Sequence, residues 1–166
     1  MRHSTLLIAA ACAVLSACSQ GGDKAETSSA PTDTPAAAPA APADPAAVKA
    51  LLASYPAPYN TADVENGRKT FGLCRSCHSI EPGGPNMVGP NLHGVFGRKA
   101  ASVADFNYSD ALKASSIVWD PQTLDKWLAE PRTFLPGTKM TFAGIKDPKS
   151  RTDVIAFLMT ESGYKP

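Results

Sequence analysis

The pentapeptide Cys74-Arg75-Ser76-Cys77-His78 constrains this chain more than any other feature of its sequence. Two cysteines separated by two residues and followed directly by a histidine are typical of covalent c-type haem attachment. Near a helix end, this spacing lets both thiols reach the vinyl groups of one haem, and the imidazole points at the iron from the same side. The motif therefore predicts a fold built around a large apolar group.

Two other kinds of site could use the same cysteines. A thioredoxin-like redox pair needs a βαβ context, which the sequence does not offer, and a four-cysteine zinc site needs a second cysteine pair. The other cysteines are Cys12 and Cys18, both in the N-terminal region. We therefore interpret Cys74 and Cys77 as the thioether positions of one covalent haem c, with His78 as an iron ligand.

The N-terminus has the pattern of an export signal. Arg2 and His3 precede an apolar run over 5–14, which is too short to span a bilayer. We predict a signal peptide over 1–17 and export of the mature chain to the periplasm.

The four residues Leu15-Ser16-Ala17-Cys18 resemble the lipobox of bacterial lipoproteins. This resemblance implies lipid on Cys18 and a membrane anchor, which several acyl chains would make stable. Ser19 favours the outer membrane over the inner one under the enterobacterial sorting rule. The alternative is an ordinary signal peptide, cut near Ala17, in which Cys18 has no special role.

The segment over 18–54 has the composition of a linker, rich in Ala, Pro, Ser, Thr and Asp. As a flexible coil it would reach about 30 Å, so we interpret it as a tether between the lipid and the domain. The alternative for its last part is a short helix over 46–53, because Val48, Leu51 and Leu52 share helical spacing.

The folded domain is predicted over 55–166. Sixteen Lys and Arg residues oppose fifteen Asp and Glu residues in the whole chain, a formal net charge of +1. Nucleic-acid binding depends on excess positive charge, so we expect no nucleic-acid partner. A domain of this size buries only part of its surface, and a haem would supply part of its core.

Apolar spacing predicts a helix at each end of this domain. Val64, Gly67 and Phe71 share one face of the first helix, with Asn60 or Thr61 as its cap. A matching apolar stripe on the last helix consists of Val154, Phe157 and Leu158. The glycine would let the two helices approach closely.

Two Asp-Pro pairs predict further helix starts. Asp120-Pro121 and Asp147-Pro148 each combine a capping side chain with proline at the first helical position. We therefore expect helices over 122–130 and 149–161, the second ended by Gly163.

A haem iron held by His78 needs a ligand on its other face. Four residues downstream carry a suitable side chain: Met87, His93, Met140 and Met159. Met140 stands in an aperiodic loop, whereas Met159 falls on the predicted last helix and fits a core position. Met87 and His93 follow His78 too closely to cross the ring, so the pattern favours Met140.

Several stretches, in this order, resemble class I c-type cytochromes of the mitochondrial and alphaproteobacterial type. They are 74–78, 88–99, 106–111, Trp119 and 136–146, within a resemblance that covers 59–163. The resemblance implies an all-α fold, with N- and C-terminal helices packed together around one haem c. It also implies His78 as the proximal ligand and Met140 as the distal one.

The resemblance assigns further contacts to the haem. The Pro90 carbonyl would accept a hydrogen bond from His78 and so fix the ring. Four residues with donor groups would lie near the propionates: Arg98, Tyr108, Trp119 and Thr138. Trp127 is also assigned to the cofactor-binding residues. Two positions depart from the family: Trp127 replaces a tyrosine and Leu112 replaces an asparagine of many relatives.

In the mitochondrial members, a ring of basic residues serves docking to redox partners, and this chain has fewer of them. Pro82, Pro85 and Met87 replace lysines that follow the C-x-x-C-H motif in those relatives. Four basic residues remain as candidates for docking: Arg75, Arg132, Lys139 and Lys146.

From these features we expect a monomeric one-electron carrier rather than an enzyme. In family terms, its donor would be a cytochrome bc1 complex and its acceptor a terminal oxidase or another haem protein. Trp127 and Leu112 keep open a gas-binding or peroxidatic protein in which Met140 dissociates readily. An electron-accepting subunit of a periplasmic dehydrogenase is a third alternative.

Overall fold

A computed structural model describes residues 44–166 of the chain. The predicted signal peptide over 1–17, the lipidation site Cys18 and the tether up to residue 43 lie outside the described residues. The helices are α1 (Pro45–Ala53), η1 (Tyr59–Thr61, a 3-10 helix), α2 (Val64–Arg75), α3 (Asp110–Ala114), α4 (Pro121–Ala129), α5 (Pro131–Phe134) and α6 (Pro148–Glu161). Within 44–166 the structure has no strand, only an isolated bridge between Lys99 and Val118. The all-α prediction is confirmed for this part of the chain.

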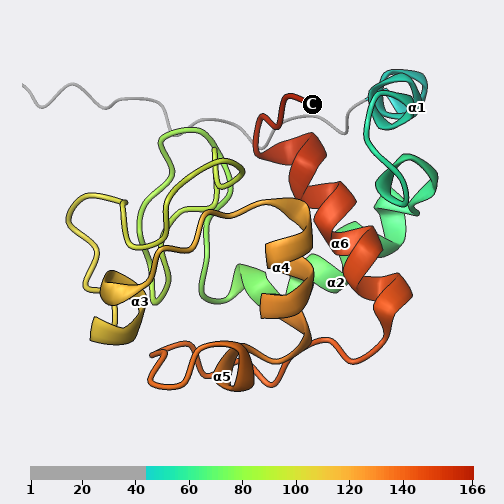
Figure 1. Ribbon diagram of the computed structural model, residues 1–166. Coiled ribbons are helices and arrows are strands. Elements are labelled where there is room, and N and C mark those ends of the chain that lie inside the picture. Colours follow the sequence, from blue (N-terminus) through green and yellow to red (C-terminus); the bar gives the residue numbers. More distant parts are fainter. Residues whose placement is uncertain (1–43) are drawn as a thin grey trace, which may run out of the picture. The chain divides into compact units, whose positions relative to one another are not determined.

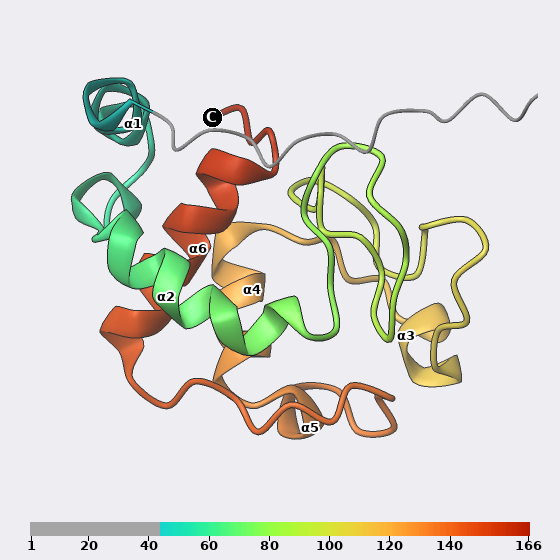
Figure 2. The ribbon, with the colours of Figure 1, turned by 180° about the vertical axis from the view of Figure 1, so that it is seen from behind.

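Helices α2 and α6 cross in close contact, with α4 packed beside α6 (Figures 1 and 2). Gly67 lies at the crossing, where an added Cβ would collide with the Asp153 carbonyl oxygen and lie 2.8 Å from the Cβ of Phe157. The rings of Phe71 and Phe157 meet one turn further on, with centroids 5.3 Å apart. The predicted role of Gly67 in close helix approach is confirmed.

The cap of α2 differs from the prediction. Asp63 caps this helix, and its Oδ1 accepts the Asn66 backbone N–H at 2.9 Å. Asn60 and Thr61, the predicted caps, belong instead to η1. A short 3-10 turn therefore precedes α2 and moves its start toward the C-terminus.

The two Asp-Pro helix starts are confirmed to within one residue. Asp120 accepts the Thr123 N–H at 2.6 Å at the start of α4, and Asp147 accepts the Ser150 N–H at 2.8 Å at the start of α6. After α6, Gly163 has φ of 77°, a left-handed conformation that favours glycine and ends the helix as predicted.

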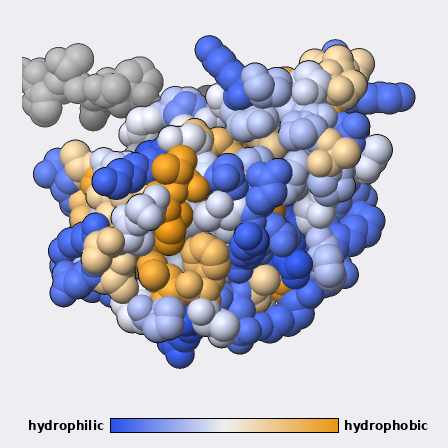
Figure 3. Space-filling view, in the orientation of Figure 1, coloured by the Kyte–Doolittle hydropathy of each residue, from blue (hydrophilic) through white to orange (hydrophobic). Residues whose placement is uncertain are grey.

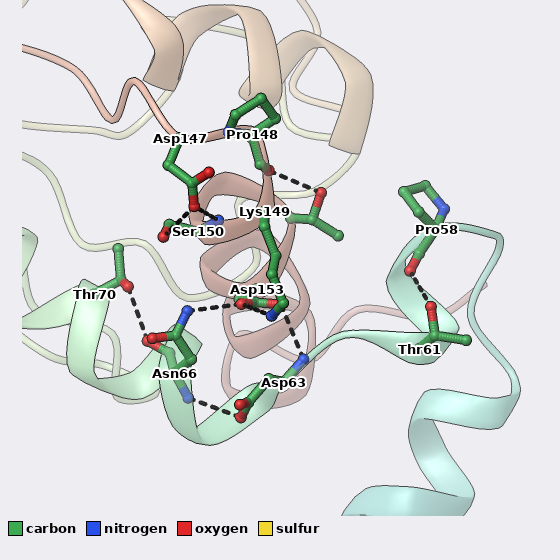
Figure 4. A network of polar contacts seen from close by, with 11 residues as sticks. Pro58, Thr61, Asp63, Asn66, Thr70, Asp147, Pro148, Lys149, Ser150 and Asp153 are labelled. Atoms are coloured by element: carbon green, nitrogen blue, oxygen red, sulfur yellow. Dashed lines mark hydrogen bonds and ion pairs between the residues drawn. The ribbon is translucent and has the colours of Figure 1, made fainter.

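A buried carboxylate joins the beginning of α2 to α6 (Figure 4). Asp153, 1% exposed, accepts hydrogen bonds from the Asp63 N–H at 2.9 Å, the Asn66 amide at 2.7 Å and the Lys149 ammonium at 2.6 Å. Burial acts to raise the pKa of this carboxyl, but the three hydrogen bonds outweigh it and leave the pKa below its ordinary value. We call Asp63, Asn66, Lys149 and Asp153 the Asp153 network.

The last residues of the segment predicted as a tether form helix α1. Val48 and Leu52 pack against the core, whereas Leu51 is 38% exposed. The structure thus contains the short helix that the apolar spacing indicated as the alternative to a linker. Beyond α1, the ring of Tyr55 contacts that of Tyr164 at a centroid distance of 5.4 Å.

No helix within 44–166 combines the length and apolar character that a membrane span requires.

The segments over 76–109 and 135–147 contain no α-helix and form the other side of the domain. Backbone hydrogen bonds tie neighbouring loops together: Gly97 N–H to Trp119 O at 2.7 Å, Trp119 N–H to Arg98 O at 3.0 Å, and Ala100 N–H to Ile117 O at 2.8 Å. These loops and the end of α2 enclose the candidate site.

Candidate haem-binding cavity

A cavity of about 440 Å³ lies between the end of α2 and the loops. All ten residues predicted to contact the cofactor line it: Cys74, Cys77, His78, Pro90, Arg98, Tyr108, Trp119, Trp127, Thr138 and Met140. The structure therefore brings together residues that lie as far as 66 positions apart in the sequence.

His78 is held in a defined orientation. Its Nδ1 lies 2.7 Å from the Pro90 carbonyl oxygen, and since that oxygen can only accept, Nδ1 carries the proton. Nε2 is then left with a free lone pair, which is what an iron ligand needs. Burial lowers the pKa of His78 and keeps the ring neutral, although the bond to Pro90 acts in the opposite direction.

Gly89 explains how the chain passes so close to this ring. A Cβ at Gly89 would lie 2.6 Å from both ring nitrogens of His78. The Gly89 N–H donates to the Cys77 carbonyl at 2.8 Å, which fixes the loop against the motif. The absence of a side chain at this position lets Pro90 reach Nδ1.

The two motif cysteines lie on the same wall as His78. The backbone continues α2 by one turn, because the N–H groups of Cys77 and His78 both donate to the Cys74 carbonyl at 3.0 Å. Burial raises the pKa of the Cys74 thiol to about 11, and the nearby Cys77 adds to the rise. Both thiols are free of disulfide bonds, so both are available for thioether formation.

Met140 lies on the wall formed by the loop over 138–143. Its N–H donates to the Thr138 hydroxyl at 3.2 Å. Lys139 holds the same loop from outside, donating to the carbonyls of Asn107 at 3.2 Å and Tyr108 at 3.1 Å. The loop that carries the thioether is thus tied to the segment before α3.

The other three candidate ligands do not line the cavity. Met159 is buried in the α6 core, as predicted, and Met87 is 47% exposed. His93 lies near Gly163 after the end of α6 and is not among the residues that line the cavity. Among the candidates, all within the described residues, Met140 alone lines the cavity.

The polar lining fits the carboxylates of a haem. The Arg98 guanidinium, half-buried, donates to the carbonyls of Asn91 at 3.0 Å and His93 at 3.1 Å, which holds its charge at the cavity wall. Burial acts to lower the pKa of Arg98 and to raise that of Tyr108. Trp119 and Thr138 add an indole N–H and a hydroxyl to the same lining.

Apolar side chains make up the rest of the wall, and sequence reasoning did not single them out as cofactor contacts. They are Leu73, Val88, Leu92, Val95, Phe106, Leu112, Leu124 and Phe142. Most stand in loops, where apolar residues follow no period, so no sequence pattern identifies them. Haem c fits this cavity. The walls are largely apolar, and they also offer two thiols, an imidazole, a thioether and hydrogen-bond donors for the carboxylates.

Comparison with known proteins places this arrangement in a family. No family model matches the chain. Cytochrome c of Kluyveromyces lactis is 42% identical over 105 residues, which are 63% of this chain and 96% of that protein. Cytochrome c2 of Rhodomicrobium vannielii is 46% identical over 118 residues, which are 71% of this chain and 94% of that protein.

A solved structure agrees with these relatives. Cytochrome cH from Methylobacterium extorquens has a TM-score of 0.56 and 49% identity, and the match covers 60% of this chain and 99% of that one. Both the sequence and the fold thus match whole c-type cytochromes. The chain belongs to the class I c-type cytochromes, as a haem-based electron carrier with one covalent haem c and not as an enzyme.

Proposed function

We propose that this cytochrome is a membrane-tethered periplasmic carrier of single electrons with His78 and Met140 as its iron ligands. The observation that carries the proposal is the fixed imidazole: Nδ1 is bound to the Pro90 carbonyl at 2.7 Å, and Met140 lines the same cavity. Haem c supplies the one-electron couple, and methionine opposite histidine raises its potential.

The surrounding residues would keep this site rigid and dry. Pro90 and Gly89 hold the imidazole, the Thr138 hydroxyl accepts the Met140 N–H, and Lys139 ties the methionine loop to Asn107 and Tyr108. Trp127 is buried at the cavity and stacks edge-to-face on Trp119 at 5.3 Å, which limits water beside the loop. A site that moves little between two oxidation states needs little reorganisation for each electron.

The N-terminal region suits a carrier that stays at a membrane. We retain the division into a signal peptide over 1–17, a lipidated Cys18 with its tether up to residue 54, and a cytochrome domain over 55–166. The last residues of that segment form α1, whose Val48 and Leu52 pack against the core of the domain. Tethering raises the concentration of a redox partner around the domain without strengthening any single contact.

The partners we propose are a cytochrome bc1 complex as donor and a terminal oxidase or another haem protein as acceptor. The relatives named cytochrome c and cytochrome c2 support a carrier of this general kind. The domain would act as a monomer at the periplasmic face, with Ser19 favouring the outer membrane.

The visible spectrum of the reduced, haem-loaded full chain, taken with and without carbon monoxide near neutral pH, tests the ligation. We expect no change on adding the gas, because Met140 occupies the sixth position. Met140→Ala is the control and should give a carbonyl spectrum at once. A carbonyl spectrum of the wild type would favour the gas-binding alternative, which the apolar Leu112 and Trp127 in the cavity wall also suit.

Two further measurements test the setting of the protein. Cys18→Ser should move the chain from the membrane to the soluble fraction, and an unchanged distribution would contradict lipid anchoring. Purification from membranes should yield the cytochrome without a stoichiometric dehydrogenase. A stoichiometric dehydrogenase partner would instead identify an accessory subunit.

A further inference from the structure

Exposed apolar side chains gather at the edge of the haem cavity. Leu73 is 60% exposed and Val88 is 79% exposed, and both line the cavity together with Cys77. Met87, next to Val88, is 47% exposed, and its N–H donates to Gly89 at 2.8 Å. We call Leu73, Met87 and Val88 the apolar rim.

These three residues are a majority of the large apolar side chains exposed within 44–166, the others being Leu51 and Val118. Figure 3 shows apolar side chains gathered in a band over the loops that follow α2, with hydrophilic surface on either side. Single exposed apolar residues are ordinary, but a cluster bordered by polar surface marks a place of contact with another molecule.

Two of the four basic residues predicted to serve docking, Arg75 and Lys146, have a carboxylate nearby. Backbone hydrogen bonds lower the pKa of Glu81, and the positive charge of Arg75 acts in the same direction against the effect of burial. Lys139 is bound to Asn107 and Tyr108, as described above. Lys146 lies 3.4 Å from a carboxylate oxygen of Glu130.

Lys139, by contrast, keeps its positive charge, because its partners are neutral oxygens. Arg132 is the fourth of these residues, and Lys99 is an exposed cation of the cavity lining. Lys99, Arg132 and Lys139 are too few to form a dense ring of positive charge. A partner that relied on a dense acidic surface would find few free positive charges opposite it.

We propose that the apolar rim docks onto an uncharged, apolar face of the redox partner, and that salt has little effect on this contact. The inference rests on the proposed carrier function. Charged surfaces attract over about 10 Å, and salt screens that attraction, whereas a contact between apolar surfaces is not weakened by screening. The tether supplies the encounter rate that electrostatic steering would otherwise provide.

Stopped-flow mixing tests this proposal. The full-length chain, haem-loaded and reduced, is mixed with membranes from source cells that lack it, at about 20 mM and about 300 mM NaCl. We expect the oxidation rate of the wild type to fall by less than about threefold between the two salt concentrations. A larger fall would overturn the apolar docking while leaving the carrier function intact.

Paired variants locate the contact. Leu73→Asp combined with Val88→Asp should lower the oxidation rate at least about tenfold, because both charges would have to be buried against an apolar face. Leu51→Asp on α1 is the matched control, an exposed apolar residue outside the cavity lining, and should leave the rate unchanged. Equal rates for both variants would overturn the proposal, and a wild type that the membranes do not oxidise at all would overturn the carrier function as well.

A measurement without electron transfer completes the test. On a phenyl matrix in high salt, the Leu73→Asp, Val88→Asp variant should elute well before the wild type and before Leu51→Asp. Unchanged visible spectra would show that all three proteins are folded around haem. If the double variant is retained like the control, the apolar rim is not the exposed apolar surface of the protein.

Discussion

The crossing of α2 and α6 and the loops around the cavity are stabilised in opposite ways. At the crossing, Gly67 lets the backbones meet, Phe71 contacts Phe157, and Asp153 has all of its partners within the chain. The loops over 76–109 and 135–147 instead surround a cavity of about 440 Å³. The helix contact is complete in the polypeptide itself, whereas the loops become a packed layer only around the cofactor.

The largest predicted effect comes from removing haem, by the combined change Cys74→Ser and Cys77→Ser. Without haem, the mostly apolar lining of this cavity would be exposed to water, and the loops would lose the apolar group that they pack against. Helices as short as α2 and α6 are marginal alone, so we expect the helices to unfold together with the loops.

Far-ultraviolet circular dichroism and amide hydrogen exchange check this outcome. The variant should lose helical signal, and amides of α2 and α6 should exchange as fast as those of the loops. Lasting protection confined to α2 and α6 would show that the helix contact forms without the cofactor. That result would mean that the helix crossing is stable independently of the cavity loops.

The second largest predicted effect concerns the crossing of α2 and α6 alone. Gly67→Val puts a branched side chain against the Asp153 backbone, and we expect it to lower the free energy of unfolding of the haem-loaded protein by about 3 kcal/mol or more. Denaturant titration measures the change. Gly72→Ala, in the same helix with no atom within 4 Å of the added Cβ, is the control and should be neutral or stabilising by up to about 1 kcal/mol.

Asp153→Ala should cost about 3 kcal/mol, because it leaves the Asp63 N–H and the Asn66 amide without their acceptor. The effect depends on pH. The pKa of Asp153 is lowered in the folded protein, so its stabilising contribution is full above the ordinary carboxyl pKa, near about 3.9, and is lost as the pH falls through the folded value.

Urea titrations at neutral and acidic pH check this prediction. The difference in unfolding free energy between wild type and Asp153→Ala should shrink below about pH 4. Glu65→Ala, at an exposed carboxylate on α2, should show a small change at either pH. A difference that stays constant with pH would mean that the Asp153 network does not titrate on unfolding.

The smallest effect belongs to the loop side. Lys139→Ala removes the bonds to Asn107 and Tyr108, and as they are near the surface we expect a loss of about 1 kcal/mol. Opening of the methionine loop should become several times more frequent, which carbon monoxide binding to the reduced protein would report. Lys146→Ala, at another basic residue that donates to a carbonyl, should leave the reduced spectrum as insensitive to carbon monoxide as that of the wild type.

The sequence predicts the helix side well because its residues obey a period. The apolar faces through Phe71 and Phe157, the glycine at the crossing and the Asp-Pro starts are all local patterns. The α2 cap was missed because η1 intervenes before Asp63. Asp153 was not singled out, because a single acidic residue beside an apolar stripe looks the same whether it faces solvent or completes a buried network.

The site was predictable where chemistry fixes the residue type, and not where the fold alone decides. The C-x-x-C-H motif specifies the haem, and the family resemblance supplies residues such as Arg98 and Thr138, all of which line the cavity. Apolar wall residues such as Phe106 stand in aperiodic loops. The bonds from Lys139 to Asn107 and Tyr108 join positions 31 and 32 residues apart, which no local pattern reveals.

The contact between Tyr55 and Tyr164 has a practical consequence for engineering this protein. It brings the start of the folded domain close to its end, and in Figures 1 and 2 α1 and the C-terminus lie away from α3. No residue after Ala143 lines the cavity. A fluorescent reporter or an electrode linker fused behind Pro166 would therefore lie at the same end of the domain as α1 and leave the cavity uncovered.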